Sequence, residues 1–239
     1  MAQTKAPLWK QVRDALAEDI RGGTLQPGER LPTEQVLSER FGVHRHTTRR
    51  ALQELREMGL VRTDQGRGSL VLERPYEYQM GRRTRFSENM SLNSLNARSH
   101  FLYGDVIPAS DIVAERLEIP VRSKVSYIKM YGEAGGKRVF VASQYMPYTD
   151  MEDLIRYFRE TGSMTRSYAR YGISDYFRKV SRITTRMSNA DEGAVLGLAQ
   201  KQPLLVVEYV NVDKRDRPLE FGVTRFCGER MEIVVRGEV

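Results

Sequence analysis

Cysteine and long hydrophobic runs are what this chain lacks. Cys227 is the single cysteine among 239 residues. One cysteine cannot form an intrachain disulfide, so a disulfide-stabilised scaffold is excluded and a reducing compartment is expected. No apolar stretch is long enough for a secretory signal or a membrane-spanning helix. We therefore expect a cytoplasmic protein with no membrane partner.

Histidine is scarce as well, which leaves little material for catalysis or metal binding. His100 stands alone and Cys227 has no histidine near it in the sequence, so no Ser-His-Asp or Cys-His arrangement is evident. His44 and His46 flank Arg45, but side chains two residues apart on a helix point in different directions, and no acidic cluster completes a site. We expect no enzyme activity, no metal and no cofactor; because distant residues can converge in a fold, an enzyme remains the alternative.

Basic residues are in excess, with 38 Lys+Arg against 31 Asp+Glu, a net charge of +7 and an isoelectric point near 9.5. This charge favours an anionic partner such as nucleic acid, but it is spread along the chain. The placement of individual arginines therefore has to show whether the partner is nucleic acid. The length allows one or two domains that need neither disulfides nor metal, and we predict two.

Residues 44–68 predict one helix followed by a tight two-stranded turn. An apolar stripe at helical spacing is formed by Thr48, Ala51, Leu52 and Leu55. Gly59 is suited to end this helix, and the glycines around Arg67 permit a reversal between strands at 60–63 and 69–72. A helix beside a basic hairpin suits a nucleic-acid surface.

Two further helices are predicted before this segment. The first covers 7–22, where apolar residues recur at i+4 steps: Leu8, Val12, Leu16 and Ile20. The second begins at Thr33 as N-cap, runs through Arg40 and ends at Gly42, with an apolar side of Val36, Leu37 and Phe41. Two short helices joined by a glycine-containing turn form a helix-turn-helix, in which the N-terminal residues of the second helix enter the major groove.

Pro75 ends the second strand of the hairpin and marks a boundary, because proline cannot continue a paired central strand. We predict a DNA-binding domain over 1–74, a linker over 75–82 and a second domain over 83–239. The last of these alternates strands and helices and has an α+β pattern. Strands are expected at 124–131, 139–146, 178–187, 204–212, 219–227 and 231–235, and a helix at 151–160.

A weak internal repeat runs through the second domain. Four apolar residues recur 79 positions later: Leu117, Ile119, Val125 and Ile128 correspond to Leu196, Leu198, Leu204 and Val207. Each copy runs from helix through strand and turn to strand. We predict two similar halves that pack into one largely antiparallel sheet, with a pocket where they meet; chance similarity of amphipathic segments is the alternative.

Three motifs in the first domain are Leu31-Pro32-Thr33-Glu34, Val43-x-Arg45-x-Thr47-x-Arg49-x-Ala51-Leu52 and Gln65-Gly66-Arg67-Gly68. In combination they resemble the winged-helix domain of the GntR family of bacterial transcription regulators. The remaining chain resembles the HutC subfamily. This resemblance implies that 83–239 is a chorismate-lyase-like domain for effector binding and dimerisation. Two stretches, Arg74-Pro75-Tyr76-Glu77-Tyr78 and Arg85-Phe86-Ser87-Glu88-Asn89-Met90, are similar to the phosphonate-metabolism regulators of that subfamily.

The candidate DNA-binding residues are Arg45, His46, Thr47, Arg49, Gly66 and Arg67. Arg45 suits a bidentate contact to guanine, because a guanidinium matches the O6 and N7 acceptors in the major groove. The resemblance implies a base or phosphate contact for Arg49 and a phosphate contact for Thr47, while Arg67 between two glycines can reach phosphate or the minor groove. Gln35 replaces a basic residue that is common in the family, and a solvated helix face is the alternative for all of these arginines.

The candidate effector-binding residues are Arg85, Phe86, Lys129, Ser163, Thr165, Arg178 and Glu220. The resemblance implies that a small anion binds between the two halves. Arg85 suits an oxyanion by bidentate hydrogen bonds, and Ser163 and Thr165 lie where the subfamily supplies hydroxyls and amides to the anion. Glu220 matches a subfamily glutamate that accepts a hydrogen bond from the ligand. Lys129 and Arg178 are alternatives for a further cation. Because Lys129, Gly132 and Ala142 replace residues usual in the first hairpin, we expect a ligand other than that of sugar-phosphate-sensing members.

Together these features predict a ligand-responsive, sequence-specific DNA-binding transcription regulator. We expect a repressor of a catabolic or uptake operon for phosphonates or other organophosphorus compounds, acting as a homodimer on an inverted repeat in double-stranded operator DNA. A regulator that answers another small anionic metabolite, and a DNA-binding protein without ligand response, remain the alternatives. An effector acts through a difference in affinity for two arrangements of the chain, and reorientation about residues 73–82 is the expected switch.

Overall fold

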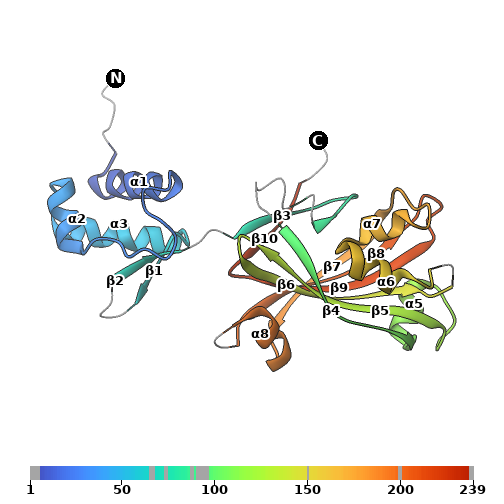
Figure 1. Cartoon of the computed structure of the whole chain (residues 1–239). Helices are drawn as coiled ribbons and strands as arrows, with labels where there is room; N and C mark the ends of the chain where they lie inside the picture. Colours follow the sequence, from blue (N-terminus) through green and yellow to red (C-terminus); the bar gives the residue numbers. More distant parts are fainter. Residues whose placement is uncertain are drawn as a thin grey trace, which may run out of the picture. The chain divides into compact units, whose positions relative to one another are not determined.

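The computed structural model describes residues 6–64, 68–72, 75–86, 89, 97–149, 151–198 and 201–236. The chain separates into two compact units, Met1–Arg74 and Pro75–Val239. The first unit combines helices with a small hairpin and the second is built on a six-stranded sheet, so the predicted α+β class is confirmed (Figure 1). Within the described part of the chain, no helix is long and apolar enough to cross a membrane.

The first unit is a winged helix. Its elements are α1 (Leu8–Arg21), α2 (Glu34–Phe41), α3 (Arg45–Glu57), β1 (Val61–Asp64) and β2 (Gly68–Val71). Thr33 caps α2 by accepting a hydrogen bond from the Val36 N–H, and Gly59 follows α3 with φ of +68°, a conformation that glycine adopts without strain. The predicted helix limits and the antiparallel pairing of β1 with β2 are confirmed.

The core of this unit joins all three helices to the hairpin. Leu16, Leu37 and Leu55 are fully buried in it. Two members of the predicted apolar stripes are nevertheless exposed, because Leu8 lies at the first turn of α1 and Val36 lies on the outer side of the short helix α2. Between α2 and α3, a buried hydrogen bond of 2.9 Å joins the hydroxyls of Ser38 and Thr48 and fixes the first helix of the helix-turn-helix against the second.

The second unit is organised by one antiparallel sheet with strand order β4-β5-β6-β9-β8-β7. The strands are β4 (Ala97–Pro108), β5 (Lys124–Ala134), β6 (Lys137–Pro147), β7 (Phe177–Met187), β8 (Pro203–Val212) and β9 (Pro218–Cys227). The predicted strands correspond to β5 through β9, within a few residues at each end, and to β10 (Met231–Val235). The sequence analysis did not identify β4, whose half-exposed pattern lacks a regular alternation.

The internal repeat is confirmed as a structural duplication. One half is β4, α5 (Asp111–Leu117), β5 and β6, and the other is β7, α8 (Ala190–Leu196), β8 and β9. The two helices lie 79 positions apart, and the halves join where β6 pairs with β9 at the centre of the sheet. Equivalent positions of the repeat therefore lie on opposite sides of that central pair.

Residues 76–80, which the sequence analysis placed in a linker, form a strand. This strand, β3 (Tyr76–Met80), pairs in parallel with β10 in a separate two-stranded sheet. Tyr78 and Met80 are buried in the main core of the second unit. The linker prediction for these residues is wrong because the strand partner lies about 150 positions away, where no local pattern points to it.

Helices cover both faces of the large sheet (Figure 1). On one face lie α6 (Leu154–Thr161) and α7 (Met164–Ala169), packed on the main core together with β3. On the other face, α5 and α8 pack on two separate apolar clusters. The polar side chains of the central strands on the first face, beneath α6 and α7, line the site described below.

Candidate functional site

The N-terminal turns of α3 carry three of the candidate DNA-binding side chains at the surface. Arg45, His46 and Arg49 are exposed and Thr47 is half-buried. Arg45 donates a hydrogen bond of 2.8 Å from Nη2 to Gln35 Oε1, so the residue at which the sequence departs from the family pattern holds this arginine. The remaining two candidates, Gly66 and Arg67, lie outside the described residues.

Arg49 forms a salt bridge with Glu34 of α2 at 3.0 Å. The hydrogen bond that Arg49 donates to Glu34, together with the negative charge of Glu34, raises the pKa of Arg49 above its ordinary value, so the guanidinium remains a cation. With its side chain 64% exposed, Arg49 is available to a phosphate that competes with Glu34. Side chains of α2 thus hold both arginines at the start of α3 in place.

The rings of His44 and His46 lie parallel, with centroids 5.3 Å apart and planes inclined by 10°. The expectation that they point in different directions is wrong, because His44 is the N-cap of α3 in an extended conformation and not a helical residue. Its side chain accepts a hydrogen bond of 3.4 Å from the His46 N–H. In the described part of the chain, no group of three or more His, Cys, Asp or Glu is placed to hold a metal.

A cavity of about 660 Å³ lies in the second unit between the sheet and the elements α6, α7 and β3. Six of the seven candidate effector residues line it: Arg85, Phe86, Ser163, Thr165, Arg178 and Glu220. They come from segments that are up to 135 residues apart in the sequence. The structure therefore brings together the set that the resemblance implied, with one exception.

Lys129 does not line the cavity, and its expected role there is wrong. Successive residues of a strand point to opposite faces of the sheet. Its neighbours Ile128 and Met130 belong to the core beneath α6, so Lys129 points to the opposite face. There it lies in register with Tyr103 on β4 and Ser143 on β6.

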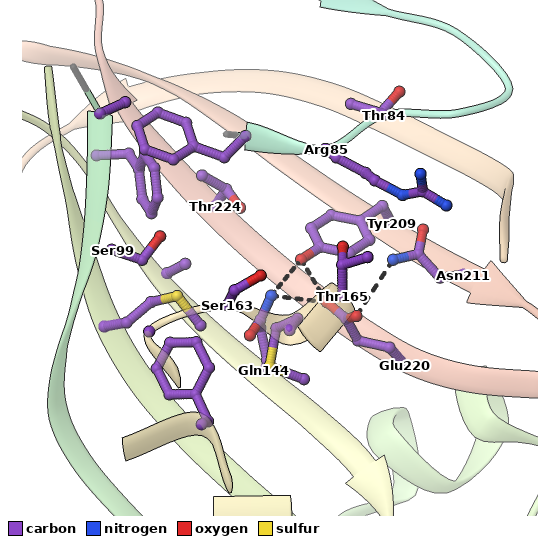
Figure 2. A pocket seen from close by; sticks show the side chains of 18 of the residues that line it. Thr84, Arg85, Ser99, Gln144, Ser163, Thr165, Tyr209, Asn211, Glu220 and Thr224 are labelled. Carbon is purple, nitrogen blue, oxygen red and sulfur yellow. Dashed lines mark hydrogen bonds between the residues drawn. The ribbon is translucent and has the colours of Figure 1, made fainter. Parts of the chain in front are cut away.

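Glu220 is the centre of a hydrogen-bond cluster at the floor of the cavity (Figure 2). It is 1% exposed, and four neutral groups donate to its carboxylate. Gln144 Nε2 and the Tyr209 hydroxyl donate to Oε1 at 2.7 and 2.6 Å, and the Tyr168 hydroxyl and Asn211 Nδ2 donate to Oε2 at 2.9 and 3.2 Å. Because four acceptor positions are filled, Glu220 acts through the groups that it orients and not as a direct acceptor for a ligand.

The tyrosines around this carboxylate remain protonated donors. Burial raises the pKa of Tyr168 and of Tyr209 well above the ordinary value, and the negative charge of Glu220 raises both further. Burial also raises the pKa of Tyr78, which lines the same cavity, to about 12. The three hydroxyls therefore keep their protons across the physiological pH range.

Arg178 lies on a strand of the same sheet as this cluster. It lies in register with Asn211, which in turn lies in register with Glu220, so a cation, an amide and a carboxylate stand side by side on three neighbouring strands. The Arg178 guanidinium carbon is 3.7 Å from the centre of the Tyr209 ring. Its Nε is buried, and within the described part of the chain this atom has no hydrogen-bond partner.

Arg85 supplies a second guanidinium. Its Nη2 pairs with Asp175 at 3.0 Å, and its guanidinium carbon lies 4.8 Å from the centre of the Tyr176 ring. Asp175 also pairs with Arg83 at 2.6 Å, and this hydrogen bond is the main reason that the pKa of Asp175 is lowered. The carboxylate therefore remains ionised and holds Arg85, whose side chain is 14% exposed, at the cavity wall.

The hydroxyls of the predicted set are held by their neighbours. Ser163 caps α7 by accepting from the Arg166 N–H, and Thr165 shares a hydrogen bond of 2.9 Å with the Tyr176 hydroxyl. The opposite wall is apolar, formed by Met130, Phe140, Ala142, Phe158, Val207 and Phe226. The cavity thus has a hydrocarbon part and a polar part, and four arginines line it: Arg85, Arg98, Arg166 and Arg178.

Among the polar cavity residues that the sequence did not point to are four on the central strands: Gln144, Tyr209, Asn211 and Thr224. A signal was present, because each is a polar or hydroxyl-bearing residue within a strand whose other inward-facing positions are mostly apolar. A single sequence does not separate such a residue from one on the solvent face until the register of the strands is known.

Two family models match the chain. The model described as bacterial regulatory proteins, gntR family, matches residues 8–71, and the model of the UTRA domain matches residues 93–232. The two matches correspond to the winged helix and to the unit that contains the cavity. The predicted combination of a GntR-type DNA-binding domain and a HutC-type effector domain is thereby confirmed.

Curated relatives match nearly the whole chain. The uncharacterized HTH-type transcriptional regulator RB1450 of Rhizobium meliloti is 31% identical over 97% of this chain and 95% of its own length. The probable transcriptional regulator PhnF of Escherichia coli is 31% identical over 87% and 86%. The mannosyl-D-glycerate transport/metabolism system repressor MngR of Escherichia coli is 29% identical over 83% and 82%. All three are named as regulators of transcription or repressors.

The fold is shared with a solved structure. The crystal structure of PhnF from Mycobacterium smegmatis matches with a TM-score of 0.69 at 24% identity, over 95% of this chain and 99% of that chain. This match establishes a common architecture of winged helix and effector domain.

Proposed function

Because the chain belongs to the GntR family of bacterial transcription regulators and carries a HutC-type UTRA domain, we propose that it represses an operon for the uptake or breakdown of phosphonates or related organophosphorus compounds. Its effector is a small phosphonate or phosphate ester that binds in the cavity of the second unit. Binding releases the operator, as expected for a repressor of a catabolic operon.

The observation that carries this proposal is the presence of several arginines around one cavity, of which Arg85 and Arg178 are the two that the sequence pointed to. Arg85 and Arg178 both line it, from segments 93 residues apart in the sequence. A guanidinium offers paired N–H donors that match two oxygens of a phosphonate, and burial strengthens the attraction. The hydroxyls of Ser163 and Thr165 lie on the same cavity and supply further polar contacts. The similarity to proteins named PhnF supports the same ligand class.

DNA recognition is assigned to the N-terminal turns of α3 and to the hairpin tip. Arg45 reads guanine, Arg49 and Thr47 contact the backbone, and His46 faces the groove. Gly66 and Arg67 approach phosphate or the minor groove from the hairpin. The protein acts as a homodimer on an inverted repeat, so that two copies of α3 enter successive major grooves.

Fluorescence anisotropy on labelled DNA tests the proposal. Purified protein is titrated onto DNA from upstream of its own gene and onto scrambled DNA of the same length, at one fixed salt concentration because phosphate contacts depend on salt. Phosphonates, inorganic phosphate and sugar phosphates are then added in turn. We expect specific binding that a phosphonate weakens; equal affinity for both DNAs, or no response to any phosphonate, contradicts the proposal.

A regulator of another small anion is the second candidate. A guanidinium binds a carboxylate as well as a phosphonate, and the similarity to MngR, which is named for mannosyl-D-glycerate, favours including carboxylated sugars among the test compounds. A response to such a compound and not to phosphonates would move the assignment to that class. Operator binding with no response to any anion would support a DNA-binding protein without an effector.

A further inference from the structure

Two neighbouring residues of α2 hold the two arginines at the start of α3, but they differ in charge. Arg49 pairs with the Glu34 carboxylate at 3.0 Å. Arg45 donates from Nη2 to the amide oxygen of Gln35 at 2.8 Å, and within the described part of the chain it forms no salt bridge. The charge of Arg49 is therefore compensated by a neighbouring anion, whereas Arg45 is held by a neutral group that leaves its charge uncompensated.

The amide of Gln35 has one orientation that suits both of its neighbours. Its nitrogen donates to Glu39 Oε1 at 3.2 Å, one turn further along α2. In the reversed orientation the amide nitrogen would face the Arg45 guanidinium, which has donors only, and the amide oxygen would face the Glu39 carboxylate, which has acceptors only. Glu39 therefore turns the oxygen of Gln35 toward Arg45.

The helix that carries Gln35 is fixed against α3 by buried contacts. Leu37 of α2 is fully buried in the core of the first unit. The hydroxyls of Ser38 and Thr48 share a buried hydrogen bond between the two helices. Because close-packed contacts leave little room for one helix to shift on the other, the bond from Arg45 to Gln35 defines where the guanidinium lies relative to α3.

A fixed and uncompensated guanidinium is suited to the recognition of guanine. The bidentate contact requires the plane of the guanidinium to match the O6 and N7 acceptors of the base. A long side chain that is already held in place loses less rotamer freedom when this contact forms. Gln35 uses one N–H of Arg45, and the other N–H groups of the guanidinium remain for the base.

We propose that Gln35 is a specificity-determining residue of the DNA-binding domain, because it positions Arg45 to read guanine and, as a neutral acceptor, leaves the charge of Arg45 to the DNA. This inference rests on the proposed function, in which Arg45 contacts guanine in the major groove. Gln35 acts through Arg45 and is a positioning residue. Arg49, whose charge is compensated by Glu34, contributes to backbone binding and not to the choice of sequence.

The first experiment uses Gln35→Ala, which removes the acceptor for Arg45 from an exposed position of α2. Fluorescence anisotropy on the full chain gives the Kd for operator DNA and for scrambled DNA of the same length, at one fixed salt concentration. We expect operator affinity to fall about two- to tenfold, as when one long side chain has to be ordered on binding, with an almost unchanged affinity for scrambled DNA. Equal losses on the two DNAs, or no loss on the operator, overturn the proposal.

Gln53→Ala is the matched control. Gln53 is likewise an exposed glutamine that donates to a glutamate one turn along its helix, Glu57 at 3.0 Å, but this pair lies in the C-terminal half of α3 and involves no arginine. We expect Gln53→Ala to bind both DNAs as wild type does. A loss of specificity in this control equal to that of Gln35→Ala would assign the effect to helix stability and contradict the positioning role.

Gln35→Glu tests whether the acceptor has to be neutral. The substitution keeps an oxygen for Arg45 and adds a negative charge, so that Arg45 becomes compensated as Arg49 is. We expect weaker binding to both DNAs and a salt dependence of the Kd that is shallower by about one phosphate contact. Operator binding as tight as that of wild type would contradict the need for a neutral acceptor.

A double-mutant cycle with Arg45→Ala separates the inference from the proposed function. If Gln35 acts only through Arg45, Gln35→Ala has no further effect on operator affinity when Arg45→Ala is already present. A further loss of the same size would mean that Gln35 contacts DNA by itself, and it would overturn the positioning role. If Arg45→Ala lowers specificity and Gln35→Ala does not, the inference alone fails; if Arg45→Ala leaves specificity unchanged, the guanine contact of the proposed function fails as well.

Discussion

Tyr209 and Gly222 face each other on the paired strands β8 and β9, and a Cβ at position 222 would lie 2.1 Å from Cζ of the tyrosine ring. The absence of a side chain at Gly222 lets the Tyr209 ring lie across β9. Its hydroxyl consequently reaches both Glu220 on β9 and Gln144 on β6, two strands from its own. One glycine therefore determines the floor of the cavity.

Gly222→Ala tests this relationship. The added methyl displaces the Tyr209 ring and breaks its hydrogen bonds to the cluster, so we expect a loss of about 1–3 kcal/mol in the free energy of unfolding and a weaker response of DNA binding to the effector. Chemical denaturation and anisotropy measure the two effects. Gly193→Ala in α8 is the control, because a Cβ there meets nothing within 4 Å, and it should be neutral or slightly stabilising. Unchanged stability of Gly222→Ala would show that the ring accommodates the methyl group.

The two arginines that share Asp175 should behave differently. Arg85 lines the cavity with its side chain 14% exposed, whereas Arg83 is 59% exposed and does not line it. Arg85→Ala should weaken binding of a phosphonate at least about tenfold, because a charge-assisted contact is lost. Arg83→Ala should leave binding close to wild type. Calorimetry on both variants decides, and an unchanged affinity in Arg85→Ala would remove Arg85 from the anion site.

Arg45→Ala should reduce sequence-specific DNA binding. A bidentate contact to guanine contributes about 1–3 kcal/mol of discrimination, so we expect a roughly 10- to 100-fold loss on operator DNA and a smaller loss on scrambled DNA. Arg56→Ala, in the last turn of the same helix, is the control that removes an equal charge away from the N-terminal turns. Anisotropy on both DNAs measures the ratio; equal losses on the two sequences would indicate that Arg45 contacts phosphate.

Glu192 links α8 to the sheet and should make stability depend on pH. The hydrogen bond from Arg186 is the largest cause of its lowered pKa, and Arg225 adds an ion pair at 3.4 Å. A carboxyl whose folded pKa lies below its unfolded value of about 4.3 stabilises the fold above that pH, and this contribution is lost as the pH falls through the folded pKa.

Glu192→Gln should therefore lower the free energy of unfolding by about 1–3 kcal/mol at pH 7. The difference in this free energy between variant and wild type should shrink below about pH 4. Urea denaturation across this pH range measures it. Glu232→Gln is the control, since Glu232 is an exposed residue of β10. A difference that stays constant with pH would mean that packing of α8, and not the charge of Glu192, is responsible.

The winged helix could be predicted almost entirely from the sequence, because its contacts are local. The apolar periods, the Thr33 cap and Gly59 place each helix, and α3 supplies a packing partner for α1, α2 and β1 within the same short unit. The stacking of His44 on His46 was missed, because it depends on whether residue 44 lies inside the helix or one position before it.

For the second unit, the sequence by itself determined strands β5 through β10, the repeat and six of the seven proposed cavity residues, since alternation and family motifs are properties of the chain alone. The tertiary structure decided which face each strand residue occupies and which strands are neighbours. In the folded sheet, Lys129 lies on the face opposite the cavity, and Gln144, Tyr209 and Asn211 surround Glu220. The physical reason is that side-chain direction in a sheet reverses at every residue, and strand register is set by pairing across long stretches of sequence.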